Sequence, residues 1–438
     1  MAVPPPVPPL PGDHLLLLLL QAGLLLLVAG ALGQAARRCA MPAVVGELLA
    51  GVLLGPSVLF QFAPGLGRML FPADPGQFHL LDAIGQLSVV LLVGTIGLRT
   101  DAALLHRRGK ALAHISGGGL LVPLGLGVGC GLLVPAALVP YGVSRQVFAL
   151  FLGVAMCVSA IPVIARTLSD LNLLHREVGQ LSIAAALLDD LFGWLMLSFV
   201  TALATTGTAG QIASALLLLL GVAILTVFPG RPIVRAVMAR CGHASDPPVT
   251  IVAVVALILL SASATHALGL EPILGAFLCG LLIGHSPAFR PASLTPLTTV
   301  VNRVLAPLYF TTVGLRTDLT VLADAQILPT ALAVLAIAVA GKFTGVFVGA
   351  LTARLGRWEA LAIGAALNAR GVIEVVIAGV GLRIGVLNTA SFTVIVLIAL
   401  TTSLMVTPIL RWAMAHIQPT AQELHRLACW RHHQAENG

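Results

Sequence analysis

Residues 187–192 have the sequence Leu-Leu-Asp-Asp-Leu-Phe and lie in the middle of an apolar segment, residues 177–204. About 20 apolar residues are enough for a helix to cross the hydrocarbon core of a bilayer. Ionisable residues inside such a helix are costly to bury and mark functional positions. Asp189 and Asp190 therefore predict a membrane helix that binds a cation or a proton. A helix-end pair in a loop is the alternative, but apolar residues flank the pair on both sides.

The rest of the chain has the same apolar character. Of its 438 residues, 58% are hydrophobic and 9% are charged, whereas soluble domains have about 25% charged residues. Such a chain cannot cover a surface that faces water, so a soluble enzyme, a disordered protein and a nucleic-acid-binding protein are excluded. The net charge of +7 does not indicate nucleic acid, because the basic residues are scattered over short loops. We expect an all-α integral membrane protein.

Thirteen segments are apolar enough to be candidate membrane spans. The chain before them, residues 1–13, is rich in proline and is expected to be disordered. The polar tail after them, residues 415–438, is expected to be cytoplasmic. The spans are predicted at residues 14–36, 41–59, 81–98, 110–138, 146–168, 177–204, 209–228, 249–268, 272–286, 298–314, 326–352, 358–382 and 388–414.

Basic residues predict the orientation of these spans. The leader before the first span has no Lys or Arg, unlike a signal peptide, and Arg37 and Arg38 follow the span. The positive-inside rule then places the N-terminus outside. Most other basic loop residues follow odd-numbered spans, and four follow even-numbered ones: Arg68, Arg145, Arg316 and Arg383. We expect a multi-pass protein of the cell membrane with a cytoplasmic C-terminus.

Three short motifs occur twice in the same order. The pairs are 46–57 with 275–286, 97–101 with 314–318, and 149–153 with 360–364. The two members of each pair lie seven spans apart, so they cross the membrane in opposite directions. The chain therefore predicts two inverted-topology repeats of six spans, with residues 209–228 as a linker helix. This architecture is typical of secondary transporters.

A lysine, Lys342, lies inside the eleventh span. Gly341, Gly345 and Gly349 form a ridge of small residues beside it, and such ridges permit close helix contact. We expect Lys342 to be held against another helix. Snorkelling of Lys342 to the lipid headgroups from a shifted span is the open alternative.

The fifth span carries a break signal at Ser159-Ala-Ile161-Pro162. Pro162 removes one backbone donor and frees a carbonyl group one turn earlier. A broken membrane helix offers carbonyl groups and half-helix ends to an ion. An ordinary proline kink is the alternative.

The repeat-related segment of the twelfth span is Asn368-Ala-Arg370-Gly-Val-Ile-Glu374. Asn and Gly beside Arg370 favour local unwinding. Arg370 and Glu374 are four residues apart and can pair on one helix face. Whether that pair serves structure alone or contacts the transported ion stays open.

Several other chemistries have no motif in the chain. A phosphate-binding glycine loop with Lys-Ser/Thr, a zinc-type ligand cluster and a Ser-His-Asp constellation are absent. We expect no enzyme activity, no ATP-driven pumping and no cofactor beyond the transported ions.

Together these motifs resemble those of the second monovalent cation:proton antiporter family, the NapA- and Kef-like sodium or potassium/proton antiporters. The resemblance covers about residues 14–414. It is carried, in order, by Gly46-Glu47-Leu-Leu-Ala-Gly51 with Gly55-Pro56-Ser57, Ser159-Ala-Ile161-Pro162, Leu188-Asp189-Asp190, Gly341-Lys342-Phe343 and Asn368-Ala-Arg370-Gly371 with Glu374.

The resemblance implies an NhaA/NapA-like fold and a homodimer. Residues 14–98 and 249–314 would form a panel with the dimer contacts. Residues 110–204 and 326–414 would form a mobile core in which the fifth and twelfth spans cross. This core would slide against the panel like an elevator.

The resemblance also implies roles for the charged residues. Asp190 would be the main carrier of cation and proton and, with Asp189, would bind the cation. Asp189 would pair with Lys342 when no cation is bound. Kef-like relatives have Gln-Asp and a nucleotide-binding C-terminal domain. This chain has Asp-Asp and is expected to have no such domain, which favours a proton antiporter; pH homeostasis and cation tolerance are equally compatible as its role.

Two other functions stay open. One is a Na⁺-coupled symporter of organic anions with a similar fold, in which Arg370 and half-helix ends would suit a carboxylate. The other is a channel-like or sensing protein without coupled transport. The Asp pair at the centre argues against an anion there.

Overall fold

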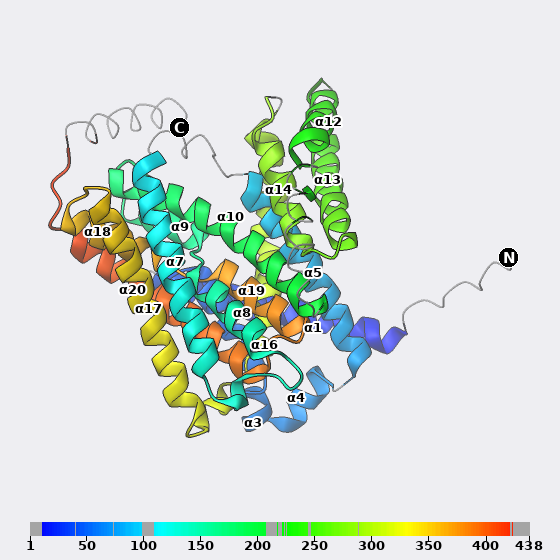
Figure 1. The fold of residues 1–438 in the computed structure, drawn as a ribbon. Coiled ribbons are helices and arrows are strands. Elements are labelled where there is room, and N and C mark those ends of the chain that lie inside the picture. Colours follow the sequence, from blue (N-terminus) through cyan, green and yellow to red (C-terminus); the bar gives the residue numbers. More distant parts are fainter. Residues whose placement is uncertain are drawn as a thin grey trace.

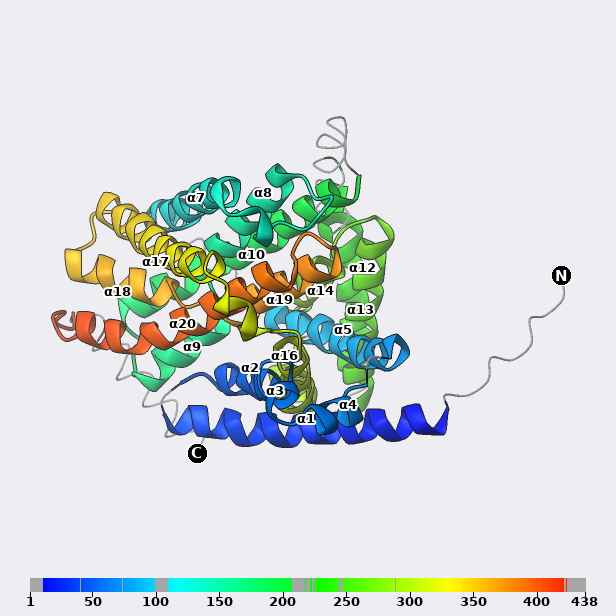
Figure 2. The same ribbon diagram turned by 90° about the horizontal axis from the view of Figure 1, so that it is seen from below.

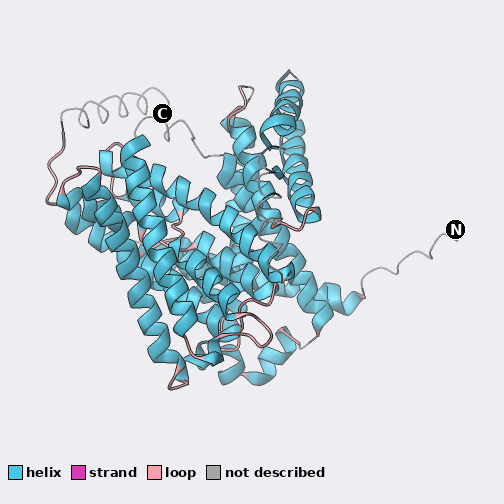
Figure 3. Ribbon diagram, viewed as in Figure 1, coloured by secondary structure: helices cyan, strands magenta, loops and turns pink. Residues whose placement is uncertain are grey.

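The computed structural model describes residues 11–39, 41–72, 74–98, 109–206, 217, 221, 222, 224, 226–243, 247–287, 289–420 and 423. Helices make up the regular structure of these residues, which contain no strand (Figure 3). The predicted all-α class is therefore confirmed for the described chain. Most of the leader, the linker helix and the tail lie outside the described residues.

Within the described residues, eight helices are long and apolar enough to cross a membrane, and a bent pair makes nine if it counts as one span. Two further predicted spans contain shorter apolar helices, Arg145–Cys157 and Pro272–Gly284. The predicted linker at 209–228 is largely undescribed, so the count of thirteen stays a prediction. A helix at Arg231–His243, α12, was not predicted.

One set of helices packs around α5, and we call it the α5 group. Its α1 lies along one edge of the molecule, beside α2 and α16 (Figure 2). Short helices α3 (Leu59–Phe62), α4 (Pro64–Leu70) and α15 (Thr295–Val300) connect its members. The group consists of α1 (Gly12–Arg38), α2 (Ala43–Leu54), α5 (Pro75–Leu98), α13 (Pro247–Ala267), α14 (Pro272–Gly284) and α16 (Ala306–Leu315).

Glycines from the duplicated motifs make the closest contacts in this group. A Cβ on Gly51 of α2 would lie 2.1 Å from the Thr311 carbonyl oxygen of α16. A Cβ on Gly280 of α14 would lie 2.1 Å from the Gly94 carbonyl oxygen of α5. In the motif alignment Gly51 corresponds to Gly280, and Thr311 to Gly94. The same contact thus occurs once in each copy, as the internal repeat predicts.

A second set packs around α10, and we call it the α10 group. Figure 1 shows α17 and α7 side by side in it, with α8 and α10 next to α7. Its members are α7 (Gly109–Leu133), α8 (Arg145–Cys157), α9 (Ile161–Asp170), α10 (Glu177–Thr206), α17 (Ile327–Thr352), α18 (Arg357–Leu367), α19 (Val372–Arg383) and α20 (Thr389–Met414).

The glycine ridge of α17 makes the close contact that the sequence predicts. A Cβ on Gly345 would lie 2.2 Å from the Gly118 carbonyl oxygen of α7, and one on Gly349 would lie 2.2 Å from the His114 carbonyl oxygen. Only glycine allows two helix backbones to approach this closely. Lys342, on the same helix, is therefore fixed against its neighbours.

Candidate functional site

Two helices of the α10 group are interrupted at the same place. The fifth predicted span breaks after Cys157 and resumes as α9 at Ile161, with Pro162 in the first turn. The twelfth breaks after Leu367 and resumes as α19 at Val372, with a bend of 43°. Proline is tolerated in a first helical turn, because the donor it lacks would have no partner there.

Hydrogen bonds join the two breaks. The Ala160 amide donates to the Ala369 carbonyl at 2.9 Å. Ser159 Oγ lies 2.7 Å from the Leu367 carbonyl oxygen, which shares the single hydroxyl proton with Asp189. Gly371 has a φ of 156°, a conformation that L side chains rarely adopt. The two breaks are thus in direct contact, and we call this place the crossing, because the family resemblance implies that the fifth and twelfth spans cross.

Asp189 of α10 lies at this crossing in a buried ion pair. Its Oδ2 accepts from Lys342 Nζ at 2.7 Å and from Ser159 Oγ at 2.6 Å. Lys342 Nζ also donates to the Cys157 carbonyl at 2.5 Å. Asp189 and Lys342 are both 0% exposed, so Lys342 does not snorkel.

Asp190 is also 0% exposed, but its environment differs from that of Asp189. Neither of its carboxylate oxygens has a hydrogen-bond partner within the described chain. The two amide atoms of Asn368, in the second break, likewise have none. A buried carboxylate without a partner is costly, and oxygen donors suit hard cations and protons. Both oxygens of Asp190 are thus buried acceptors without a donor in the described chain.

Arg370 and Glu374 pair at 3.3 Å, as their spacing predicts. Arg370 Nη2 also donates to the carbonyls of Met156 at 2.7 Å and Ala338 at 3.0 Å. Lys342 and Arg370 thus bind the last carbonyl groups of α8, which are left without helical partners. A cation at a helix C-terminus is also favoured by the helix dipole.

Most of the predicted site residues meet at this crossing. Glu47, which belongs to the first motif of the family resemblance, lies in α2 of the α5 group and packs against Gly33. Ser403 of α20, which donates to the Arg370 carbonyl, was missed. The described residues contain no group of three or more His, Cys, Asp or Glu side chains placed to hold a metal ion.

A comparison with protein families matches residues 23–412 to the family described as sodium/hydrogen exchanger, transmembrane. The Na⁺/H⁺ antiporter NhaS4 of Synechocystis sp. is 32% identical over 403 residues, which cover 90% of this chain and 96% of that protein.

Other relatives are longer. Cation/H⁺ antiporter 18 of Arabidopsis thaliana is 31% identical over 90% of this chain and 48% of its own length. K⁺/H⁺ antiporter 1 of Saccharomyces cerevisiae is 30% identical over 91% of this chain and 46% of its own length. The chain spans about half the length of these plant and yeast relatives.

Solved structures share the fold. The sodium proton antiporter MjNhaP1 of Methanocaldococcus jannaschii at pH 8 is similar with a TM-score of 0.63 at 16% identity. The match covers 92% of this chain and 97% of that structure.

Proposed function

The chain belongs to the sodium/hydrogen exchanger family of monovalent cation:proton antiporters, and we propose that it exchanges a monovalent cation, Na⁺ or K⁺, for protons across a membrane. One observation carries the proposal. Asp190 is buried, has no partner for either oxygen, and lies next to the Asp189–Lys342 ion pair at the crossing of two broken helices.

Exchange follows from competition for one carboxylate. A carboxylate binds a metal cation only in its deprotonated form, so a proton and a cation exclude each other at Asp190. A site that opens alternately to the two sides then releases one ion before it takes up the other. Asp189 is the second carboxylate that a cation at Asp190 meets.

Lys342 balances the charge of Asp189 while no cation is bound. A cation entering beside Asp189 repels the Lys342 ammonium and competes with it for the carboxylate. Lys342 then has to move away from Asp189 or give up its proton. If it gives up the proton, more than one proton is exchanged per cation.

The surrounding polar residues hold this arrangement in place. Ser159 orients Asp189 through a bond of 2.6 Å. Arg370, neutralised by Glu374, fixes the end of α8. The Asn368 amide oxygen, which has no partner within the described chain, is the further oxygen donor left for the cation. Ile161 and Pro162 start the half-helix that follows the first break.

Movement of the site requires two parts that can slide. The α10 group carries Asp190 and acts as the mobile core, and the α5 group acts as the panel, in an elevator-type movement. The panel is the homodimer contact that the family resemblance implies, and its α1 exposes a row of large apolar side chains to the membrane or to a partner: Leu15, Leu16, Leu19, Leu20 and Leu27. The N-terminus lies outside and the C-terminus in the cytoplasm of a cell-membrane protein.

Symport of an organic anion fits the site less well. Arg370 is fully buried, and its bonds go to Glu374 and two backbone carbonyls. Arg370 Nε has no hydrogen-bond partner within the described chain, but the charges of Arg370 and Lys342 are balanced by Glu374 and Asp189. Among the described residues of the crossing, no unbalanced basic group is therefore left for a carboxylate substrate.

The test is cation-dependent proton movement in liposomes. Purified protein is reconstituted with an internal pH dye, a proton gradient is imposed, and Na⁺, K⁺ or Li⁺ is added outside in turn. We expect one or more of these cations to dissipate the gradient with the wild-type chain. Asp190→Asn should not respond, although it stays folded and dimeric.

The proposed exchange would be rejected if none of the three cations dissipated the gradient with the wild-type chain, or if flux continued without an opposing ion gradient, as in a channel-like protein. Normal exchange by Asp190→Asn would leave the exchange standing but show that the carrier lies elsewhere.

A further inference from the structure

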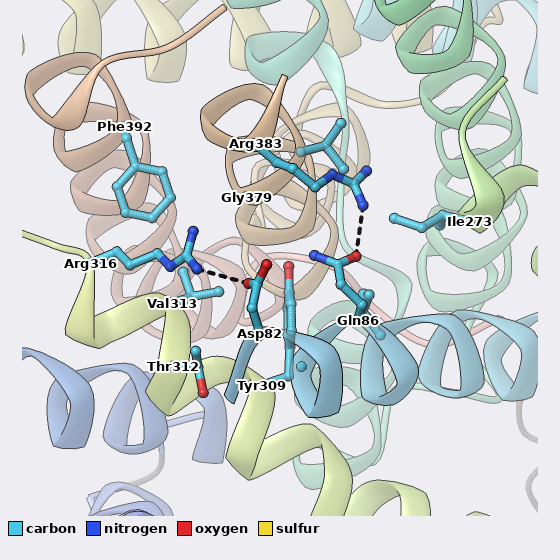
Figure 4. A pocket seen from close by; sticks show the side chains of 13 residues that line it. Asp82, Gln86, Ile273, Tyr309, Thr312, Val313, Arg316, Gly379, Arg383 and Phe392 are labelled. Atoms are coloured by element: carbon cyan, nitrogen blue, oxygen red, sulfur yellow. Dashed lines mark hydrogen bonds and ion pairs between the residues drawn. The ribbon is translucent and has the colours of Figure 1, made fainter. Parts of the chain in front are cut away.

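Arg383, the last residue of α19, connects the two helix groups. Its Nη2 donates to Glu271 Oε2 at 2.6 Å, and its Nη1 donates to Gln86 Oε1 at 2.8 Å. Glu271 is the N-cap residue of α14, and Gln86 lies in α5. Figure 4 shows the Arg383 guanidinium above Gln86. One side chain of the α10 group thus binds two helices of the α5 group.

The two charged partners differ in exposure. The Glu271 side chain is 4% exposed, and the Arg383 side chain is 29% exposed. Separating such a pair returns the guanidinium to water but leaves a buried carboxylate without its counter-charge, which is costly. The contact therefore favours the arrangement in which α19 lies against α14.

A second ion pair lies beside this one but within a single group. Arg316 follows α16 and binds Asp82 of α5 at 2.8 Å (Figure 4). Both residues belong to the α5 group, so this pair does not separate when the two groups move relative to each other. It is a natural control for the Arg383 contact.

Arg383 lines two cavities. One has a volume of about 690 Å³ and is also lined by Phe60 and Phe78. The other, of about 30 Å³, is also lined by Val89 of α5 and Tyr309 of α16. Asp82 and Arg316 line both cavities too. Of the three residues that line both, Arg383 is the one from the α10 group.

Next to Arg383, α19 packs closely against α16 of the α5 group. Gly379 lies one turn earlier on α19, and a Cβ at this position would be 3.0 Å from Tyr309 Oη of α16. The two groups are therefore in direct contact at this level. A relative movement of several ångströms separates Arg383 from Glu271 and opens this end of the interface.

We propose that Arg383 is a positioning residue of the exchange. Its bonds to Glu271 and Gln86 stabilise the position of the α10 group in which the two groups are in contact at Arg383. These bonds break each time the α10 group moves so that Asp190 opens to the side of the membrane on which Arg383 lies. Arg383 follows an even-numbered span, so this side is the outside in the orientation proposed above. The inference rests on the proposed exchange by relative movement of the two groups.

The first experiment measures the apparent KM for the cation from each side in oriented vesicles. Arg383→Gln removes the charge and favours the outward-open position, so the ratio of the inside to the outside KM rises about tenfold, within the usual range of coupling between two states. Glu271→Gln shifts the ratio in the same direction. Arg383→Lys keeps the positive charge opposite Glu271 but loses the second hydrogen bond, to Gln86, so its KM ratio lies between those of the wild-type chain and Arg383→Gln. Arg316→Gln leaves the ratio unchanged.

The second experiment reads the opening without transport. Val89, which is 1% exposed, is replaced by Cys, and its reaction with a membrane-impermeant thiol reagent outside is measured above the background of the parent chain. Arg383→Gln should speed labelling about tenfold, whereas Arg316→Gln should not.

The outcomes separate the two proposals. Equal KM ratios and equal labelling in Arg383→Gln and Arg316→Gln overturn the positioning role, even if exchange is normal. If Arg383→Gln is labelled faster but no variant exchanges a cation, the contact still holds the two groups together, and the proposed function is rejected.

Discussion

Replacing Lys342 by Met tests whether the ion pair at the crossing holds the α10 group together. Met matches the length of Lys but has no charge. Lys342→Met leaves Asp189, which is 0% exposed, with Ser159 as its one remaining donor and no counter-charge. Breaking a buried pair by removing one partner costs about 3–5 kcal/mol. We expect the free energy of unfolding, measured by denaturant titration in detergent without Na⁺ or K⁺, to fall by about that amount.

Two controls separate charge from packing. The double variant Lys342→Met with Asp189→Asn has no uncompensated charge, so its cost should be well below the sum of the two single costs. Lys110→Met changes the chain's other lysine, which is exposed at the start of α7, and should cost no more than about 0.5 kcal/mol. Additive single costs, or a Lys342→Met chain as stable as Lys110→Met, would refute the reasoning.

Two further predictions concern residues outside the crossing, one in the contact of α17 with α7 and one in the contact of Glu423 with the start of α10. Gly345→Ala places a Cβ 2.2 Å from the Gly118 carbonyl and should destabilise the chain by about 1–3 kcal/mol, whereas Gly117→Ala, which meets nothing within 4 Å, should be tolerated in the same unfolding assay. Partial burial raises the pKa of Glu423, but the amides of Glu177 and Thr420 and the Arg176 guanidinium outweigh it and hold that pKa below its ordinary value of 4.5. Its stabilising effect is therefore complete above that value and is lost as pH falls through the folded-state pKa. Glu423→Gln should increase proteolysis of the chain after Ile417 at neutral pH. An unchanged rate would contradict a stabilising contact of Glu423 with Arg176 and Glu177.

The parts of the site that carry rare chemistry could be predicted from the sequence. Buried charge in an apolar span is unusual enough to single out Asp189, Asp190, Lys342 and the Arg370–Glu374 pair. Pro162 predicted the first break, and the repeat pointed to the second. These signals lie in short stretches of sequence, so they can be recognised without knowledge of the fold.

The partners of these charges could not be predicted. Lys342 and Arg370 bind the carbonyl groups of Cys157, Met156 and Ala338, and every residue has such a group. Which carbonyl is unpaired and within reach depends on where α8 ends in space. The Arg383–Glu271 contact joins residues 112 positions apart, and each alone resembles an ordinary loop charge.

Proton release on cation binding tests the central claim most directly. Purified protein in weakly buffered detergent solution is titrated with Na⁺ and, separately, with K⁺, and the pH is recorded. If the cation and proton share Asp190, the wild-type chain releases protons as the cation binds, and Asp190→Asn releases none. Cation binding without proton release in the wild-type chain, or equal release from Asp190→Asn, would contradict a shared site at Asp190.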